Sequence, residues 1–389
     1  MEYCYSDRNY LAMVLAALPF LRVIKFLPEL PTSIYYGLLI LVGIIQYVKY
    51  GINDISKVTI CFFIFCFISL LLNDVDPKYR ASERLIGLLC ISIAVGPLIY
   101  NDYADVLRKD CLRYVCIFCI LVCVASLGLY FIAPALTYTL RGNLYGGITV
   151  HSMTLSPLGA IGALYSIQYL IKNIDNMGFK MKLLWGGIAI VCLINCILAG
   201  SRSALISCVL AVITWLWFFF RDNKKTFFRY LISITAIIGL SAPLWLKYTE
   251  TIQKKIEYSE SQGSMLSSRQ GRWEARIDEI KHNPISGCGF STIEGIASEK
   301  GTVEPGNGWL FIWSSAGLIS FVLFCSIYYK AAVNAVNTSS NNGFFVLSLL
   351  VFFAFHLMAE GYSISSGNPF CFMLWLTFGI GNFYKYSEL

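Results

Sequence analysis

Residues 199–212 read AGSRSALISCVLAV, a turn of small residues that carries one arginine between two long apolar runs. The runs extend over about residues 183–199 and 202–220, and each can cross roughly 30 Å of hydrocarbon as a helix. Similar runs recur along all 389 residues, of which 57% are hydrophobic and 14% are charged. This balance excludes a soluble domain of this length and predicts an all-α polytopic membrane protein.

The apolar runs predict about twelve membrane-spanning helices. Their expected ranges are 9–27, 33–50, 57–73, 82–100, 111–132, 151–171, 183–199, 202–220, 229–246, 307–329, 343–359 and 369–385. We expect the first nine helices within residues 1–246, a large loop with an amphipathic helix at 247–306, and three further helices within residues 307–389.

Lysine and arginine residues are distributed unevenly between the two sides of the predicted membrane. With the N-terminus in the cytoplasm, fifteen of them fall on the cytoplasmic side and seven on the outer side, leaving out the large loop. The positive-inside rule then places both termini in the cytoplasm and the large loop outside. Topology does not explain the outer seven, which are Arg22, Lys25, Lys78, Arg80, Arg84, Arg141 and Arg202.

Arg202 follows Gly200 and Ser201 in a turn too short to form a solvated loop. An ionisable residue at the end of a membrane segment usually faces protein or a water-filled cavity. Arg202 could extend to the interface as a long side chain does. Alternatively, it could bind an anion, because a guanidinium donates paired hydrogen bonds to phosphate and keeps its proton.

The large loop contains MLSSRQGRWEARIDEIKHNPISGCGF, residues 265–290, in which Ser267 or Ser268 can cap a helix that Pro284 ends. Three arginines share one face of this helix: Arg269, Arg272 and Arg276. Three apolar residues share an adjacent face: Trp273, Ile277 and Ile280. We expect one stripe to lie on the membrane-embedded body and the other to point into a cleft.

The arginines near the start of this helix could cradle a diphosphate, because free N–H groups and the helix dipole already favour an anion there. Alternatively, the helix could lie in the interface and hold lipid headgroups. Arg276 could also simply pair with Glu279 or Asp278.

Five further polar residues lie at predicted outer ends of spans. Asn307 could cap the span that begins there or bind a sugar hydroxyl, and Glu304 nearby could act as a base. Arg141 precedes a glycine-rich turn, and His151 starts a span, where its role could be structural or chemical. Glu360 is costly at a membrane boundary unless it pairs with an arginine or takes part in chemistry.

Several segments, in this order, resemble the O-antigen ligase and O-antigen polymerase superfamily. They are the RG…HS segment at 141–152, GSRSALI at 200–206, SRQGRW and NPISGCGF between 268 and 290, and NGWLFIWSSAGLIS at 307–320. Ligases generally carry a histidine just before the residue that Asn307 matches, whereas this chain has Gly306. The resemblance therefore favours the O-antigen polymerase branch.

The resemblance implies a metal-independent glycosyltransferase of the bacterial inner membrane, GT-C-like in fold and without a cofactor. Such an enzyme polymerises oligosaccharide repeat units into O-antigen or capsule by transferring the growing glycan from undecaprenyl diphosphate to an acceptor sugar hydroxyl. The implied partners are the undecaprenyl-diphosphate-linked glycan, membrane lipid, and a chain-length regulator and flippase. Basic residues spread over two sides of a membrane do not indicate nucleic-acid binding.

The chemistry assigns a role to each candidate residue, because the leaving diphosphate needs charge stabilisation and the acceptor hydroxyl needs a base. The candidates for diphosphate binding are Arg202, Arg269, Arg272 and Arg141. The candidates for sugar binding are Asn307 and Trp273. The candidates for the catalytic base are Glu360, His151 and Glu304.

Two alternatives stay open. A ligase of the same superfamily would deliver the glycan to lipid A core. An anion transporter could use the same arginines as a pathway, although the two halves of the chain show no clear repeat of interrupted spans, and the arginines gather on one side of the membrane.

Overall fold

The computed structural model describes residues 10–28, 30–139, 144–233, 236, 267–293, 305–338 and 340–383. Within these ranges the chain is almost entirely helical. The helices are α1 (Tyr10–Ala17), α2 (Thr32–Tyr50), α3 (Lys57–Leu72), α4 (Ala81–Ala94), α5 (Asp102–Ile132), α6 (Ser152–Lys172), α7 (Phe179–Leu198), α8 (Arg202–Phe219), α11 (Ser267–His282), α13 (Gly308–Asn337), α14 (Asn341–His356) and α15 (Pro369–Phe383). The short elements are η1 (Phe20–Arg22), η2 (Pro77–Tyr79), η3 (Pro134–Thr137) and the antiparallel pair β1 (Asp54–Ile55) and β2 (Ile99–Tyr100).

Five of the described helices are long and apolar enough to cross a membrane, namely α2, α5, α7, α8 and α13. Shorter apolar helices accompany them at Tyr10–Arg22, Lys57–Leu72, Asn342–His356 and Pro369–Phe383. The predicted all-α membrane class is therefore confirmed. The count of twelve stays a prediction, because most of the span expected at 229–246 lies outside the described residues. The division of the chain into two sets of helices and a large loop also stays a prediction.

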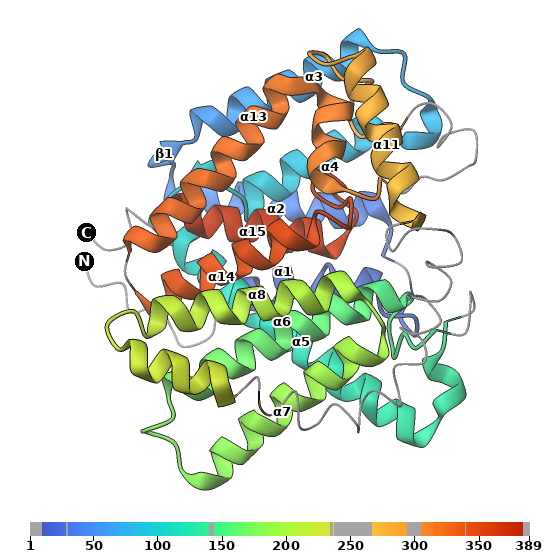
Figure 1. Cartoon of the computed structure of the whole chain (residues 1–389). Helices are drawn as coiled ribbons and strands as arrows, with labels where there is room; N and C mark the ends of the chain where they lie inside the picture. Colours follow the sequence, from blue (N-terminus) through green and yellow to red (C-terminus); the bar gives the residue numbers. More distant parts are fainter. Residues whose placement is uncertain are drawn as a thin grey trace.

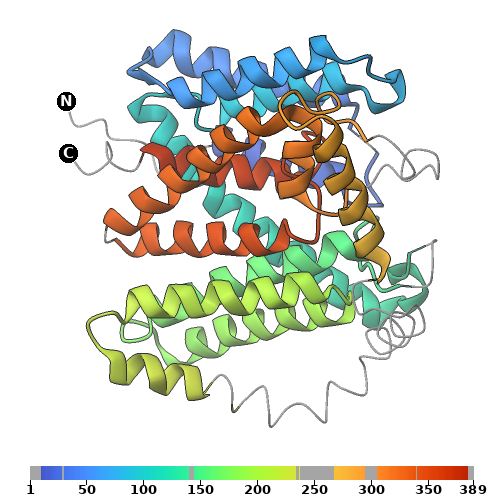
Figure 2. The same ribbon diagram turned by 45° about the horizontal axis from the view of Figure 1, so that its top comes forward.

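The C-terminal helices lie between the two other parts of the bundle. Helix α13 packs on α3 and helix α14 packs on α8. Figure 1 labels the helices, and Figure 2 shows α13, α14 and α15 between α3 on one side and α6 to α8 on the other. The helices are apolar on most sides, so the buried core is continuous from α1 to α15.

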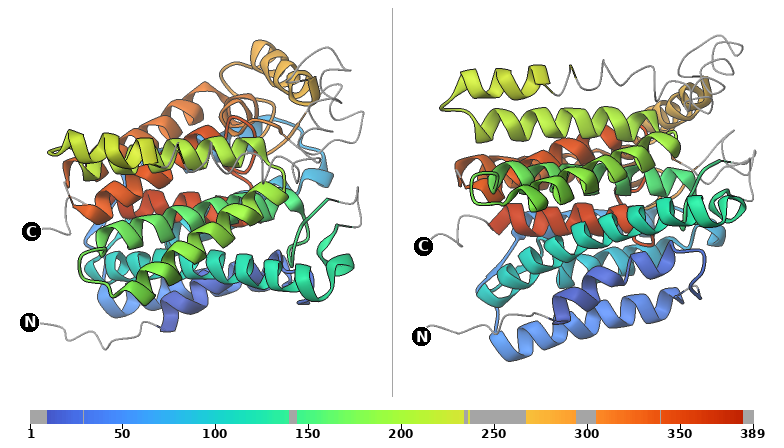
Figure 3. Two further views of the ribbon diagram at one scale, coloured as in Figure 1. Left: turned by 60° about the horizontal axis from the view of Figure 1, so that its bottom comes forward. Right: turned by 90° about the horizontal axis from the view of Figure 1, so that it is seen from below.

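The register between α8 and α14 decides which residues meet at each end of the bundle. The rings of Phe218 and Phe344 lie 5.7 Å apart, and the two helices run antiparallel. Arg202 lies sixteen residues before Phe218, and Glu360 lies sixteen residues after Phe344. The start of α8 and the end of α14 therefore lie at the same level, and Figure 3 shows α11 at this end as well.

Helix α13 is broken at Gly317, whose φ of 81° and ψ of 172° are not helical. Residues 284–293, here called the docking loop, fill the break. The Cys288 amide donates to the Ser314 carbonyl at 2.8 Å. A Cβ at Gly317 would lie 1.9 Å from the Ile285 carbonyl oxygen, so only glycine permits this approach. Within a membrane body a broken helix must have its backbone groups satisfied by protein, and the docking loop does this.

A second irregular segment lies at the other end of the bundle. Helix α4 ends at Ala94, and residues 95–98 are buried without helical structure. Gln46 donates to the Ala94 carbonyl at 3.1 Å, and Arg108, which is fully buried, donates to the Ile99 carbonyl at 2.5 Å. Buried polar side chains here take over the hydrogen bonds that a continuous helix would have made.

Candidate functional site

Helix α11 brings Arg269 against the turn that follows α14. Its Nη2 donates to Glu360 Oε1 at 3.0 Å, and the two side chains are 24% and 15% exposed. Its Nη1 is buried and has no hydrogen-bond partner among the described residues. Arg269 therefore holds a carboxylate with one nitrogen and keeps a second nitrogen that the described protein atoms do not use. Of the two alternatives for Glu360, pairing is the one that this structure shows.

His356 and Tyr362 lie beside this pair. His356 Nδ1 is 2.9 Å from the Tyr362 hydroxyl, and the His356 ring stacks on Phe352 with centroids 5.3 Å apart. Burial first, and then the charge of Glu360, hold the pKa of Tyr362 well above its ordinary value, so the phenol stays protonated. This hydroxyl can donate to the imidazole and fix the turn that carries Glu360.

Sequence reasoning overlooked both residues, although a signal was present. His356 stands four residues before Glu360 at the end of an apolar helix, and the Glu360 amide donates to the His356 carbonyl at 3.0 Å. This spacing places two polar residues on the same helix face. A polar pair at the end of a membrane segment is a candidate site by itself.

The start of α13 packs tightly against α11. Trp273, a predicted sugar-binding residue, donates from Nε1 to the Gly306 carbonyl at 3.2 Å, so its indole nitrogen is used within the protein. Gly306 has a φ of +74°, and a Cβ there would lie 2.9 Å from Cβ and Cδ of Arg272. A histidine at this position would strain the backbone and displace Arg272. The replacement of the ligase-type histidine by glycine thus has a packing reason.

Asn307 caps α13. Its Oδ1 accepts hydrogen bonds from the amides of Trp309 at 2.9 Å and Leu310 at 3.1 Å, and the residue is 7% exposed. The structure shows the capping role that sequence reasoning left open, and the side-chain oxygen is committed to it.

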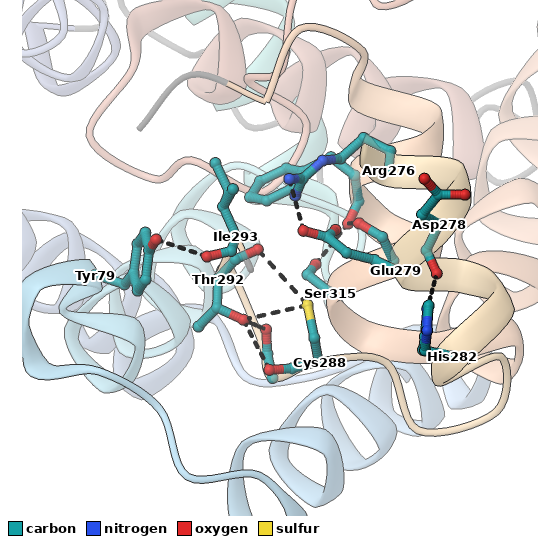
Figure 4. Close-up of polar contacts among 12 residues, drawn as sticks. Tyr79, Arg276, Asp278, Glu279, His282, Cys288, Thr292, Ile293 and Ser315 are labelled. Carbon is teal, nitrogen blue, oxygen red and sulfur yellow. Dashed lines mark hydrogen bonds and ion pairs between the residues drawn. The ribbon is translucent and has the colours of Figure 1, made fainter. Parts of the chain in front are cut away.

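Arg276 corrects the predicted arrangement of α11. It is 1% exposed and pairs with Glu279 at 2.6 Å, one of the two partners foreseen for it. Figure 4 shows this pair beside the part of the docking loop that carries Cys288 and Thr292. Ile277, expected on the apolar stripe, is 41% exposed. The expected separation of an arginine face from an apolar face is therefore wrong, because a buried carboxylate compensates the guanidinium and allows it to face the body.

The docking loop is also fixed to the helices beneath it. The Tyr79 hydroxyl donates to the Ile293 carbonyl at 2.6 Å, as Figure 4 shows. Arg84 donates to the Ser291 hydroxyl at 3.0 Å. These bonds join the loop that follows α11 to η2 and α4, so α11 is held at a defined place relative to the bundle.

Arg202 is the first residue of α8 and is half-buried. It makes no ion pair and no side-chain hydrogen bond with the part of the chain that the structure describes. The register with α14 puts it at the level of Glu360. A cation at a membrane boundary is costly without a partner, so Arg202 is a candidate for binding an anionic ligand.

His151 is the N-cap residue of α6; its side chain is exposed and does not cap the helix. The Cys208 sulfur lies 3.6 Å from the Ala160 carbonyl oxygen, so α6 runs beside α8. His151 is nine residues before Ala160 and residue 199 is nine residues before Cys208, so these two residues lie at the same level. His151 therefore belongs to the same end of the bundle as Arg202. Arg141 and Glu304, the other two predicted site residues, lie outside the described residues.

Residues 187–325 match the family model described as O-Antigen ligase. The matched range includes Arg202, Arg269, Arg272 and Asn307. No curated protein matches the chain. The family match supports the O-antigen ligase and polymerase superfamily, as the sequence motifs predicted. Members of this superfamily are glycosyltransferase-like enzymes, ligases or polymerases, and the family implies lipid-linked glycan substrates and a bacterial membrane.

Proposed function

We propose that this protein polymerises lipid-linked oligosaccharide repeat units into a surface polysaccharide at the outer face of the bacterial inner membrane. It would transfer the growing glycan from undecaprenyl diphosphate to an acceptor sugar hydroxyl. The observation that supports this most directly is that Arg269, Glu360 and Arg202 gather at one end of an apolar bundle.

The arginines suit the leaving group. When the glycosidic bond breaks, the diphosphate gains charge, and preorganised guanidinium groups stabilise that charge without moving. Arg269 has an unused buried nitrogen, and Arg202 makes no ion pair with a described residue. Arg272 lies one helical turn from Arg269, and Arg141 would complete the set.

The Arg269–Glu360 pair suggests how donor binding prepares the acceptor reaction. A diphosphate that binds Arg269 competes with Glu360 for the same guanidinium, so its binding would release the carboxylate. The acceptor oxygen then attacks the anomeric carbon, the bond from that carbon to the diphosphate breaks, and the diphosphate leaves with the electron pair. Glu360 takes the hydroxyl proton. His151 and Glu304 remain the other candidates for this base.

Gly306 supports a polymerase rather than a ligase. Ligases that this chain resembles carry a histidine at this position, and here the left-handed backbone and the contact with Arg272 oppose one. The ligase stays the second candidate, because the matched family is described as O-Antigen ligase. An anion transporter is less well supported, since the arginines lie at one end of the bundle rather than along a path through it.

Deletion of the gene tests the proposal. A polymerase deletion should leave a single repeat unit attached at the cell surface, while longer chains vanish from a polysaccharide gel. Complementation with Arg202→Ala should also give single repeats only. Complete loss of attached glycan on deletion would instead identify a ligase. If the proposal holds, a chain-length regulator and a repeat-unit flippase are expected to act beside this protein.

A further inference from the structure

We propose that a second lipid-diphosphate site lies at the outer ends of α2 and α4, continues into the groove between α3 and α4, and holds the acceptor substrate. This inference rests on the proposed function, because a polymerase uses a lipid-linked molecule as acceptor as well as donor. The site lies across the turn between α14 and α15 from the Arg269–Glu360 pair.

The polar half of the site is a pocket of about 530 Å³ between the first turn of α2 and the first turns of α4. Its lining combines the hydroxyls of Thr32, Ser33 and Tyr36 with the charged side chains of Arg80 and Glu83. A volume in this range is typical of pockets that hold a small molecule.

The apolar half is a groove of about 460 Å³ between α3 and α4. Phe63, Ile64 and Phe67 form its wall on α3, and Leu85 and Leu89 form its wall on α4. Its lining is wholly aliphatic and aromatic, as a hydrocarbon chain requires.

Ile86 of α4 lines both hollows and is 56% exposed. Along the same face of α4, Glu83 stands three residues before Ile86 and Leu89 stands three residues after it, so the face changes from polar to apolar with depth. One amphiphile could therefore place its head against α2 and its tail against α3, with Ile86 beside the junction.

Two arginines lie in or beside the head pocket, and one carboxylate, Glu83, shares its lining. Arg80 pairs with Glu83, an exposed contact that a diphosphate could replace at little cost. Arg22 lies next to the pocket, 3.4 Å from the Thr32 hydroxyl and 5.2 Å from the centre of the Tyr35 ring. Its Nη1 is buried without a hydrogen-bond partner among the described residues. The chemistry of this pocket thus fits a phosphorylated head group.

The apolar groove suits an amphiphile with a single tail. A prenyl diphosphate has a single chain that one groove could hold, whereas a phospholipid has two, and among the described residues the groove and the head pocket share Ile86 as a lining residue. The Tyr36 hydroxyl lies 2.6 Å from the Ser366 hydroxyl, and Ser366 belongs to the same interhelical turn as Glu360. An acceptor head held at Tyr36 could therefore extend its sugars over this turn toward the base.

Photo-crosslinking of the full-length protein in nanodiscs tests the site directly. The probe is a farnesyl diphosphate that carries a benzophenone on its last isoprene unit. We expect labelled peptides from α3 and α4, and we expect unlabelled farnesyl diphosphate to abolish the labelling while phosphatidylglycerol does not. Equal competition by phosphatidylglycerol would show an ordinary membrane-lipid groove only and would overturn the proposal, as would labelling confined to other helices.

Ile86→Trp should fill the passage between the two hollows. Its matched control is Ile190→Trp in α7, because Ile190 is 59% exposed on another face of the bundle. We expect Ile86→Trp to lower labelling of α3 and α4 and to raise KM for the lipid-linked acceptor by about tenfold, with kcat unchanged. The control should behave as wild type, and both variants should elute as folded protein. Undiminished labelling of the Ile86→Trp variant would refute the site.

These two experiments separate the inference from the proposed function. If the probe labels α3 and α4 and Ile86→Trp removes the label, the lipid-diphosphate site stands even when the purified protein makes no polymer. If the protein polymerises glycan but never binds the probe at α3 and α4, the function stands and this site is wrong.

Discussion

The two ends of the bundle each contain an arginine within a largely apolar protein, and they use it differently. Arg108, near the end of α15, is fully buried, donates to the Ile99 carbonyl and lies 5.6 Å from the centre of the Phe383 ring. Arg269, at the other end, is 24% exposed and pairs with a carboxylate. A diphosphate could reach Arg269 and displace its partner, whereas Arg108 is fully buried and out of reach of a ligand. Accessibility and a replaceable partner distinguish a ligand-binding arginine from a structural one.

Arg269→Ala should give the largest effect. Removing a preorganised donor to the leaving group typically costs about 100- to 1000-fold in rate, so long-chain polysaccharide should vanish from a gel while the single repeat persists. Lys281→Ala is the matched control, because Lys281 lies on the same helix and its side chain is 68% exposed. A normal ladder of chain lengths from the Arg269→Ala variant would contradict a ligand-binding role for Arg269.

Glu360→Gln should reduce polymerisation by about 100-fold, within the range for loss of a general base. The amide keeps a hydrogen-bond acceptor for Arg269 but cannot take the acceptor's proton. The rate of glycan transfer by purified protein measures this effect. Near-normal transfer would leave Glu360 with a role in holding Arg269 only, and would direct attention to His151.

Arg269→Lys should reduce the rate by about tenfold, less than alanine does. Lysine keeps the positive charge but loses the planar fork that binds two phosphate oxygens at once. The distribution of chain lengths on a gel should shift toward short chains. Full activity of the lysine variant would mean that charge alone matters at this position.

Arg108→Met should have the smallest effect on chemistry. It leaves the Ile99 carbonyl without its donor, at a cost of about 1–3 kcal/mol in stability. We expect less folded protein in the membrane and a lower thermal midpoint, with unchanged activity per folded molecule. A selective loss of activity at normal stability would contradict the structural role assigned to Arg108.

The sequence predicted helix bounds better than it predicted tertiary contacts. A helix was predicted between a cap at Ser267 or Ser268 and Pro284, and α11 runs from Ser267 to His282; the identity of its cap stays a prediction. Periodicity placed Arg269 and Arg276 on one face, but it could not show that this face packs against the body. That outcome depends on Glu279 and on the docking loop, and hence on tertiary packing.

Other features escaped sequence reasoning for a similar reason. Nothing near Gly317 in the sequence indicates that a loop some thirty residues upstream enters the helix there, because the contact depends on tertiary structure. The head pocket likewise exists only because α2 and α4 lie side by side. His356, by contrast, could have been predicted from the sequence, since its four-residue spacing from Glu360 is visible there.

The docking loop fixes the height of the arginines. Its backbone forms hydrogen bonds with α13 inside the bundle, so the position of α11 is set by the protein and not by the lipid headgroups. A thicker or thinner bilayer would then move the lipid diphosphate relative to Arg269, while Arg269 stays in place. If the proposed function holds, glycan transfer would be fastest in membranes whose thickness brings the lipid diphosphate to the level of Arg269, and its rate would depend on bilayer thickness.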